Sequence, residues 1–260
     1  MPVERMQIKR VNILGVGISA INMARALSTF DEWIQDGSKQ YVCVTPAHAV
    51  MDCYRDPSLR SIFNASGLTT PDGMGIVWLL RLHGERDVSR VYGPDLMANV
   101  CKLSVEKRWR HFLYGGEPGV ADCLKSKLEA QFEGIQIVGT YSPPFRPLHD
   151  AEEQDVIRTI NAARPDLLWI GISSPKQERW MSQHLPLLNA SVMVGVGAAF
   201  DFLSGCKPQA PRWMQGLGLE WLFRLATEPR RLWPRYSQYP LFVFLVLAQF
   251  LGLRKYSLGE

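Results

Sequence analysis

Short apolar runs alternate with segments of helical periodicity along residues 11–197. Strands that are covered by helices on both faces show such continuous runs rather than strict apolar–polar alternation. The runs lie at 11–16, 41–45, 111–116, 135–141, 167–173 and 191–197, with helical patterns at 19–33, 119–133 and 152–164. The alternation predicts an α/β fold with a mainly parallel, Rossmann-like sheet flanked by helices.

The pattern changes after about residue 207, where strand-like runs stop. We therefore expect an α/β domain at 1–207 and a helical, arginine-rich and apolar appendage at 208–260. The segment 240–253 is almost wholly apolar, but its 14 residues are fewer than the about 20 needed to span a bilayer. It is either a core helix or a segment lying in a membrane interface, and the flanking Trp, Tyr and Arg residues favour the interface.

The net charge of +4 comes entirely from the end of the chain. Residues 212–260 carry 7 basic and 3 acidic side chains, whereas residues 1–211 carry 22 of each. This asymmetry predicts an anionic partner for the appendage. The five cysteines form no CxxC pair, and the N-terminus lacks the apolar core of a signal peptide, so we expect a protein of the cytoplasm.

Glycines follow three of the predicted strands, and in a parallel sheet such strand ends meet at the edge where ligands bind. Glycine also lets backbone N–H groups approach a phosphate closely. A single such glycine is most often a plain turn, but their convergence favours a nucleotide or sugar site. The candidate residues of this site are Gly115, Gly116, Gly171, Lys176, Gln177, Glu178, Gly195, Gly197 and Asp201.

Asp72 lies between a strand-like piece at 68–70 and an apolar, helix-like run. One interpretation is a helix N-cap, a position that favours Asp. The other is a general base at the ligand edge of the sheet, with Arg90 as a nearby cation. Asp95 is a candidate cap for the next helix.

The run GVGISA at 15–20 fits the GxGxxA form of the dinucleotide fingerprint, which lies in a strand-to-helix turn. An NAD(P)-dependent enzyme is therefore an alternative, but the second predicted strand lacks the acidic residue that holds a ribose. A tight strand-to-helix turn is the simpler interpretation. The histidines show no metal-site spacing and no DxD occurs, so we expect no metal and no resident cofactor.

Taken together, these motifs resemble the WecG/TagA/CpsF glycosyltransferases, family 26 of the carbohydrate-enzyme classification. The matching pieces are TTPDGMGIVW, RVYGPDLM, HFLYGG, GISSPKQERWM, GVGAAFDFLSG and QAPRWMQGLGLEWLFRLATEPRRLWPRY, in order from about 41 to 236. The resemblance implies an inverting enzyme that moves a sugar from a UDP-sugar to a polyprenyl-diphosphate-linked saccharide. It also implies that the enzyme acts at the inner face of the cell membrane and is peripherally attached there.

The resemblance assigns roles to residues of this chain. Asp72 would be the catalytic base, with Thr45, Arg90 and Gln177 in the active site. Arg224, Arg231 and Arg235 of the appendage would bind the lipid diphosphate. Ala47 stands where teichoic-acid members carry Asn, and His48 follows it. This departure favours exopolysaccharide-type members and a glucose or other hexose donor.

The expected reaction is therefore sugar transfer in exopolysaccharide or cell-surface glycan synthesis. One alternative is transfer of N-acetylmannosamine, or its uronic acid, for a teichoic-acid or common-antigen glycan, and a non-enzyme alternative is a membrane-associated assembly scaffold. The expected partners are the UDP-sugar, the lipid-linked acceptor and the membrane surface, with no nucleic acid. The resemblance also raises exchange between a monomer and a homo-oligomer, which the residues leave open.

Overall fold

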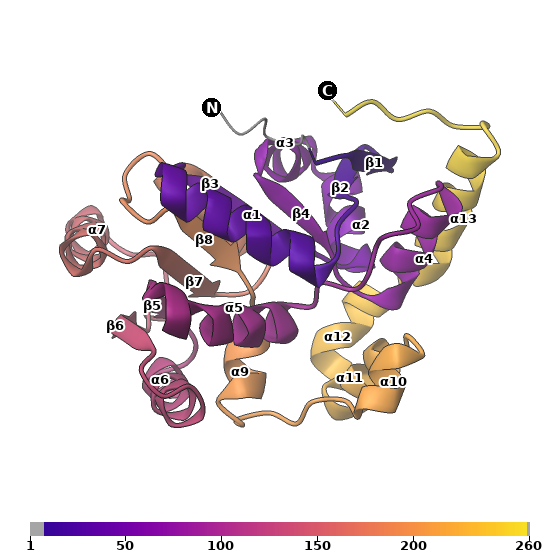
Figure 1. Cartoon of the computed structure of the whole chain (residues 1–260). Helices are drawn as coiled ribbons and strands as arrows, with labels where there is room; N and C mark the ends of the chain where they lie inside the picture. The colour runs from indigo at the N-terminus through magenta and orange to yellow at the C-terminus, as the bar shows by residue number, and fades with distance from the viewer. Residues whose placement is uncertain (1–7, 259–260) are drawn as a thin grey trace.

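The computed structural model describes residues 8–258. The charged residues at the very start of the chain, on which the expectation about the signal peptide partly rests, lie outside this range. Figure 1 shows a sheet at the centre of the molecule, helices on both of its faces, and the C-terminal helices at one end. We call residues 8–207 the body and residues 208–258 the appendage, following the division predicted from the sequence.

The body contains a six-stranded sheet in the order β4-β3-β8-β7-β5-β6, and all paired strands are parallel. Five of the six strands, all except β4, confirm the predicted apolar runs, and β4 matches the strand-like piece at 68–70. The strands are β3 (Gln40–Thr45), β4 (Leu68–Pro71), β5 (Arg110–Gly115), β6 (Gln136–Tyr141), β7 (Leu167–Gly171) and β8 (Val192–Gly195). The α/β fold with a parallel, helix-flanked sheet is therefore confirmed.

Two helical layers bury the sheet on both faces, which explains the continuous apolar runs. One layer is α2 (Ala47–Arg55), α3 (Pro57–Ala65), α7 (Asp150–Ala163) and α8 (Lys176–His184). The other is α1 (Met23–Asp36), α5 (Gly93–Lys107), α6 (Val120–Gln131) and α9 (Ala199–Leu203). Trp169 of the central strand β7 is completely buried between them.

The predicted first strand at 11–16 is wrong. The chain forms a separate antiparallel hairpin of β1 (Arg10–Ile13) and β2 (Val16–Ser19). Leu14 and Gly15 make the turn with positive φ angles of 52° and 88°, and the side chain of Asn12 accepts the N–H of Gly15 at 2.8 Å. GVGISA is thus a hairpin turn and a strand rather than a strand-to-helix turn, so the dinucleotide interpretation loses its structural basis.

The hairpin lies against the edge strand β4 through polar side chains. The N–H of Ser19 donates to Oγ1 of Thr69, and the N–H of Thr69 donates to Oγ of Ser19, both at 3.1 Å. An exposed strand edge is a site for unwanted pairing with other chains. The hairpin covers the edge of β4, which is also the strand that leads to Asp72.

The connections place a crevice between β3 and β8. The helix after β3, α2, packs on one face of the sheet, while the helix after β8, α9, packs on the other. Ligands of open α/β sheets bind where neighbouring strands lead to opposite faces, beyond their carboxyl ends. The topology alone therefore points to the ends of β3 and β8.

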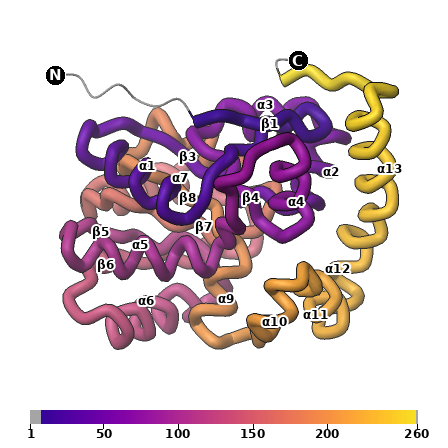
Figure 2. The backbone as a smooth tube through the Cα atoms, turned by 45° about the vertical axis from the view of Figure 1, so that its right-hand side comes forward, coloured from indigo at the N-terminus to yellow at the C-terminus, as the bar shows by residue number. Residues whose placement is uncertain are grey.

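The appendage is helical, as its composition predicts. It comprises α10 (Arg212–Gly216), α11 (Glu220–Thr227), α12 (Pro229–Tyr236) and α13 (Tyr239–Phe250). Figure 2 shows α13 along one side of the body and α10 to α12 below it. Within the described part of the chain, no helix combines the length and apolar character needed to cross a membrane.

Helix α13 packs on the body with one face and leaves the other exposed. Phe242, Leu245 and Val246 belong to the core of the body, whereas Phe244 is 63% and Leu247 is 54% exposed. The core-helix interpretation of the segment 240–253 thus holds for one face of α13, while the other face is exposed. The side chain of Gln249 also exchanges two 2.9 Å hydrogen bonds with the backbone of the hairpin.

Candidate active site

Two adjoining cavities lie between the carboxyl edge of the sheet and the appendage. The outer cavity, of about 250 Å³, lies between α4 (Met74–Leu82) and the helices α11 to α13. The inner cavity, of about 80 Å³, lies at the ends of β3 and β8, in the crevice that the topology predicts. Pro46, His48, Asp72 and Arg224 line both cavities and mark their junction.

Asp72 directly follows β4 and does not cap a helix. The N-cap of α4 is Gly73, with a φ of 88° and no side-chain cap hydrogen bond. The interpretation of Asp72 as an N-cap is therefore wrong. Its side chain is 16% exposed and lies at the cavity junction.

Burial raises the pKa of Asp72 to about 6, and Glu220 adds to this shift while Arg90 opposes it. A carboxyl group with this pKa is mostly ionised at pH 7 and still accepts a proton readily, as a general base requires. Raised carboxyl pKa values in clefts are typical of functional sites.

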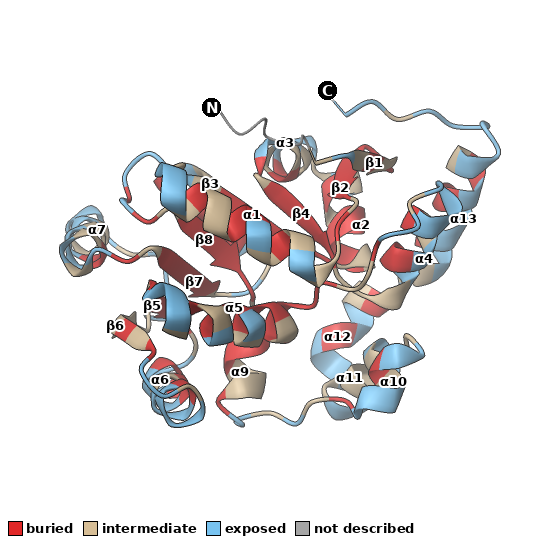
Figure 3. Cartoon of the chain, in the orientation of Figure 1, coloured by how far each residue is buried: buried red, intermediate tan, exposed pale blue. Residues whose placement is uncertain are grey.

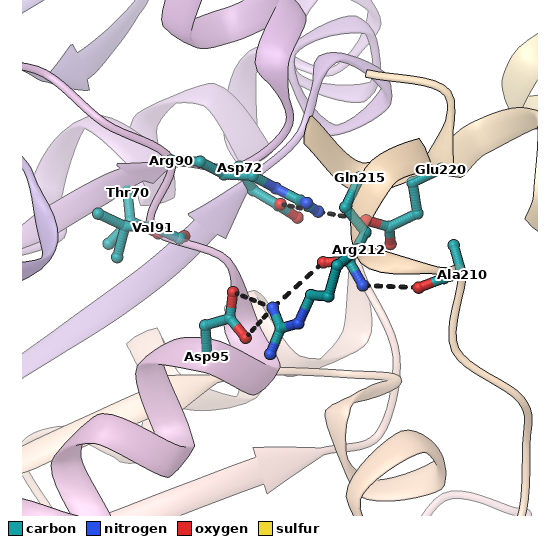
Figure 4. Close-up of polar contacts among 9 residues, drawn as sticks. All are labelled: Thr70, Asp72, Arg90, Val91, Asp95, Ala210, Arg212, Gln215 and Glu220. Carbon is teal, nitrogen blue, oxygen red and sulfur yellow. Dashed lines mark hydrogen bonds and ion pairs between the residues drawn. The ribbon is translucent and has the colours of Figure 1, made fainter. Parts of the chain in front are cut away.

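Arg90 is held beside Asp72 by its neighbours. The N–H of Val91 donates to the carbonyl of Pro71 at 3.0 Å, and the hydroxyl of Thr70 donates to the carbonyl of Val91 at 3.2 Å. These bonds fasten the loop before α5 to the end of β4. Nη2 of Arg90 then reaches Oδ1 of Asp72 at 3.4 Å (Figure 4).

Glu220 is a site residue that the sequence did not reveal. It starts α11, lines the outer cavity and forms a close ion pair with the same nitrogen of Arg90 that faces Asp72. The two partners are separated by 130 positions in the chain. Its position within GLEWL, a run that carried the resemblance, was the signal that could have found it.

The three arginines predicted to bind the lipid diphosphate converge on the inner cavity. Arg224 lies with its guanidinium 5.5 Å from the ring centroid of Phe202, and Arg235 donates to the carbonyl of Ser174 at 3.0 Å. Arg231 pairs with Glu228 of its own region at 2.6 Å. Guanidinium groups bind phosphate oxygens in pairs, so this cluster can neutralise a diphosphate.

Several predicted residues of the nucleotide-sugar site also lie at the inner cavity. Gln177 and the backbone of Gly195 and Gly197 line it. A Cβ atom at Gly195 would lie 2.9 Å from Nε2 of Gln177, so the glycine makes room for this amide. Lys176 starts α8, but it does not line the cavity, and its Nζ instead lies 5.5 Å from the ring centroid of Phe145.

The glycines of β5 and β7 serve the packing of the sheet instead. A Cβ at Gly115 would lie 2.6 Å from the backbone of Gly171, and one at Gly171 would lie 2.7 Å from the ring of Phe200. Neither these two glycines nor Gly116 lines a described cavity. Close contact between neighbouring elements explains these glycines without a ligand.

Three further predicted residues make internal contacts. Thr45 is buried, and its hydroxyl donates to the carbonyl of Cys43 at 2.8 Å. Glu178 is buried behind Gln177, whose amide donates to it at 2.9 Å, and Asp201 pairs with Lys207 at 2.8 Å. None of Thr45, Glu178 and Asp201 is among the described residues that line the two cavities.

Asp95, predicted as a helix cap, instead joins the two regions. It lies in the first turn of α5, whose N-cap is Tyr92, and it accepts Arg212 of the appendage at 2.9 and 3.0 Å (Figure 4). The cap prediction is therefore wrong. Asp95–Arg212 and Arg90–Glu220 are two ion pairs between body and appendage.

His48 lines both cavities and is 8% exposed. Its Nδ1 has no hydrogen-bond partner among residues 8–258. Burial lowers the pKa of His48 to about 3, and the charges of Arg235 and Arg224 add to this effect. The ring is therefore neutral at pH 7 and can donate one hydrogen bond and accept another.

No group of three or more His, Cys, Asp or Glu side chains within residues 8–258 is placed to hold a metal ion. The charged groups described at the inner cavity that can face a phosphate are arginines. The arrangement thus combines a carboxyl group of raised pKa, a cluster of arginines and, in the outer cavity, an apolar and aromatic wall that includes Trp78, Trp221 and Tyr239.

The chain is similar over most of its length to known glycosyltransferases. The chain is 32% identical over 198 residues to the N-acetylglucosaminyldiphosphoundecaprenol N-acetyl-beta-D-mannosaminyltransferase of Bacillus subtilis (strain 168), covering 75% of this chain and 74% of that protein. It is 29% identical over 243 residues to the enzyme of that name from Bacillus spizizenii (strain ATCC 23059 / NRRL B-14472 / W23), covering 93% and 91%. The Staphylococcus aureus (strain NCTC 8325 / PS 47) enzyme of the same name is 23% identical, covering 94% of each chain. The family model described as "Glycosyl transferase WecG/TagA/CpsF family" matches residues 11–256, so this chain belongs to the WecG/TagA/CpsF family of glycosyltransferases.

Proposed function

We propose that this glycosyltransferase moves an N-acetylmannosaminyl group from a UDP-sugar to N-acetylglucosaminyl-diphospho-undecaprenol, with inversion at the anomeric carbon. The position of Asp72 at the junction of the two cavities carries the proposal. The names of the relatives support this donor and acceptor better than the exopolysaccharide reading. Ala47 stands where teichoic-acid members of the family carry Asn, so the test of the proposal has to compare donors.

The inner cavity suits the diphosphate of the donor. Arginines and strand-end backbone line it, and its volume of about 80 Å³ matches part of a nucleotide sugar rather than the whole. Arg224 is common to both cavities and would lie near the bond that breaks. We therefore assign the three arginines to the diphosphate of the donor rather than to the lipid diphosphate that the resemblance implies, and in transfer they offset the charge that develops on the leaving UDP.

The outer cavity suits a lipid-linked sugar. Its wall is apolar and aromatic, and it reaches Asp72, Arg90 and Glu220 at its inner end. Asp72 takes the proton of the acceptor hydroxyl, whose oxygen forms a bond to the anomeric carbon. The bond between that carbon and the phosphate oxygen breaks, and UDP leaves with the electron pair.

The test is transfer by the purified full-length protein from radiolabelled UDP-N-acetylmannosamine or UDP-glucose to a polyprenyl-diphosphate-linked N-acetylglucosamine. We expect label in the lipid fraction from UDP-N-acetylmannosamine. Transfer from UDP-glucose alone would refute the proposed donor and support the hexose donor that Ala47 favours. Transfer from neither sugar would refute the proposed reaction.

We also propose that the mouth of the outer cavity rests on the membrane. Large apolar side chains are exposed around it on α4, α10 and α13, and patches of this kind mark interaction surfaces. Among them, Trp78 is 49%, Trp213 63% and Phe244 63% exposed. The ends of α4 and α13 meet through His83 and Phe250, whose ring centroids are 5.9 Å apart.

This surface can be tested without removing the appendage, because α13 contributes to the core of the body. A Trp213→Ser/Phe244→Ser variant should sediment less with vesicles of anionic phospholipid than wild type. Phe145→Ser is the matched control, since Phe145 is fully exposed on the loop that joins β6 to α7, two elements that lie at the opposite end of the molecule from α13 (Figure 1). Equal sedimentation of the double variant and wild type would refute the membrane role of this surface.

A further inference from the structure

One guanidinium nitrogen serves two carboxylates at the cavity junction. Nη2 of Arg90 contacts Oε2 of Glu220 closely and Oδ1 of Asp72 at 3.4 Å (Figure 4). The three side chains are only 12–16% exposed, and all line the outer cavity. The sharing is therefore unequal, and it takes place where the acceptor is proposed to bind.

The unequal sharing affects what Asp72 can do. N–H···O hydrogen bonds have donor–acceptor distances of about 2.7–3.2 Å, so the contact with Asp72 is a loose one. A guanidinium that pairs closely with a carboxylate stabilises its ionised form and makes it a weaker base. Because Glu220 holds the closer contact, Asp72 keeps more of its capacity to take a proton.

Other groups around Asp72 do not replace this contact. Arg224 attracts the ionised form from the same helix as Glu220, but more weakly than Arg90 does. The charged and titratable groups whose electrostatics couple to Asp72 are Arg90, Glu220, Arg224, Tyr92, Tyr236 and Tyr239. Of these, Glu220 is the acidic one that also contacts Arg90.

Glu220 reaches Arg90 only because α11 lies on the body. The turn before α11 contains Gly218, with a φ of 73°, and a Cβ there would lie 3.2 Å from the ring of Trp78 on α4. The turn therefore packs directly on α4, and Glu220 follows two residues later. Within α11, whose residues are all described, no side chain is fully buried, so polar contacts matter for its position.

We propose that Glu220 is a positioning residue for transfer: it holds Arg90 on the appendage side and leaves Asp72 free to accept the proton of the acceptor hydroxyl while α11 is docked. The inference rests on the proposed function, with Asp72 as the base. It makes the docked appendage a condition for an active base, in addition to its part in binding phosphate.

The test compares Glu220→Gln with Glu220→Asp in the full-length protein. In Glu220→Gln, Arg90 loses its stronger partner and turns to Asp72, which becomes a weaker base. We expect the acidic limb of the kcat/KM profile to move to lower pH and the plateau to fall about threefold to tenfold. Glu220→Asp, which keeps the carboxylate, should retain the limb near that of wild type even where its plateau is reduced.

Asp95→Asn is the matched control, because it breaks another ion pair between body and appendage and lies outside both cavities. Its acidic limb should stay in place. A Glu220→Gln profile with an unmoved acidic limb would overturn the proposal and leave Glu220 a docking contact only. Absence of transfer by wild type itself would instead refute the proposed function, so the two failures are distinguishable.

Discussion

The strands of the body and the helices α10 to α12 of the appendage bury their side chains very differently (Figure 3). Leu167, Leu168 and Trp169 of β7 are fully buried between two layers of helices. In α12 only Leu232 and Tyr236 are buried, and α10 buries only Gln215. The body builds its own core, whereas these helices bury few side chains and are joined to the body by ion pairs such as Arg90–Glu220 and Asp95–Arg212.

This difference places the site on the boundary between two kinds of structure. The body supplies Asp72, Arg90, Gln177 and a rigid sheet edge. The appendage supplies Arg224 and Glu220 from a helix with no fully buried side chain. Segments with few buried apolar contacts open most easily, and elements that bind ligands are often drawn from them. Substitutions in the two regions should therefore fail in different ways.

The largest effect is expected from the body, at Asp72. Asp72→Asn removes the proton acceptor but keeps the shape, so kcat should fall about 10²- to 10⁴-fold, as measured by transfer of label. Near-normal kcat in this variant would remove Asp72 from the role of base.

The same substitution should change how stability depends on pH. Because the pKa of Asp72 is raised from 3.8 to about 6 in the folded protein, the folded state binds more protons than the unfolded state between these values. Its contribution to the free energy of unfolding therefore declines as pH rises from about 4 to about 6. Urea unfolding of wild type and Asp72→Asn across this range should show a steeper decline in wild type, because other carboxyl groups titrate in both proteins, and equal slopes would contradict the raised pKa.

The next largest effect is expected from the appendage. Arg224→Gln removes a cation common to both cavities, and a hydrogen bond to a charged group contributes about 1.5–3 kcal/mol, so KM for the UDP-sugar should rise about tenfold to hundredfold. Arg212→Gln is the matched control, since Arg212 is 73% exposed and outside the cavities. Similar KM values for both variants would show that the charges act by docking alone.

A smaller effect is expected at His48, where a substitution should lower activity without lowering the free energy of unfolding. His48→Phe keeps the ring but removes a buried nitrogen that has no partner among the described residues, so the free energy of unfolding should stay equal or rise. If the nitrogen serves a substrate, kcat/KM should fall about threefold to tenfold. His149 is the N-cap of α7 and lies outside both cavities, so His149→Asn, which places a residue favoured at N-caps there, controls for the assay. A loss of stability in His48→Phe would assign the ring a structural role.

Local pattern was enough to predict most of the body. Runs such as 41–45 and 167–173 are apolar because two layers of helices bury them, and that cause is visible in the sequence. The hairpin was missed because its turn depends on Leu14 in a left-handed conformation and on a hydrogen bond that the side chain of Asn12 accepts from the N–H of Gly15. Neither has a strong signal in a single sequence.

The site was predicted less completely, because chemistry and packing use the same residue types. Gly115 and Gly171 were interpreted as phosphate-binding glycines, yet Gly115 allows two strands to meet and Gly171 makes room for the ring of Phe200 in α9. Glu220 was not predicted as a site residue, because its partner Arg90 lies 130 positions away in the chain. The arginines were found through the charge asymmetry and the family resemblance together.

Amide hydrogen exchange with and without UDP tests most directly whether the two regions form one site. Without ligand, α11 and α12 should exchange faster than β7 and β8. UDP should slow exchange both after β8 and in α11 to α12, because Arg224, Arg231 and Arg235 line the same cavity as Gly195 and Gly197. Protection confined to the body, with α11 and α12 unchanged, would contradict a site completed by the appendage.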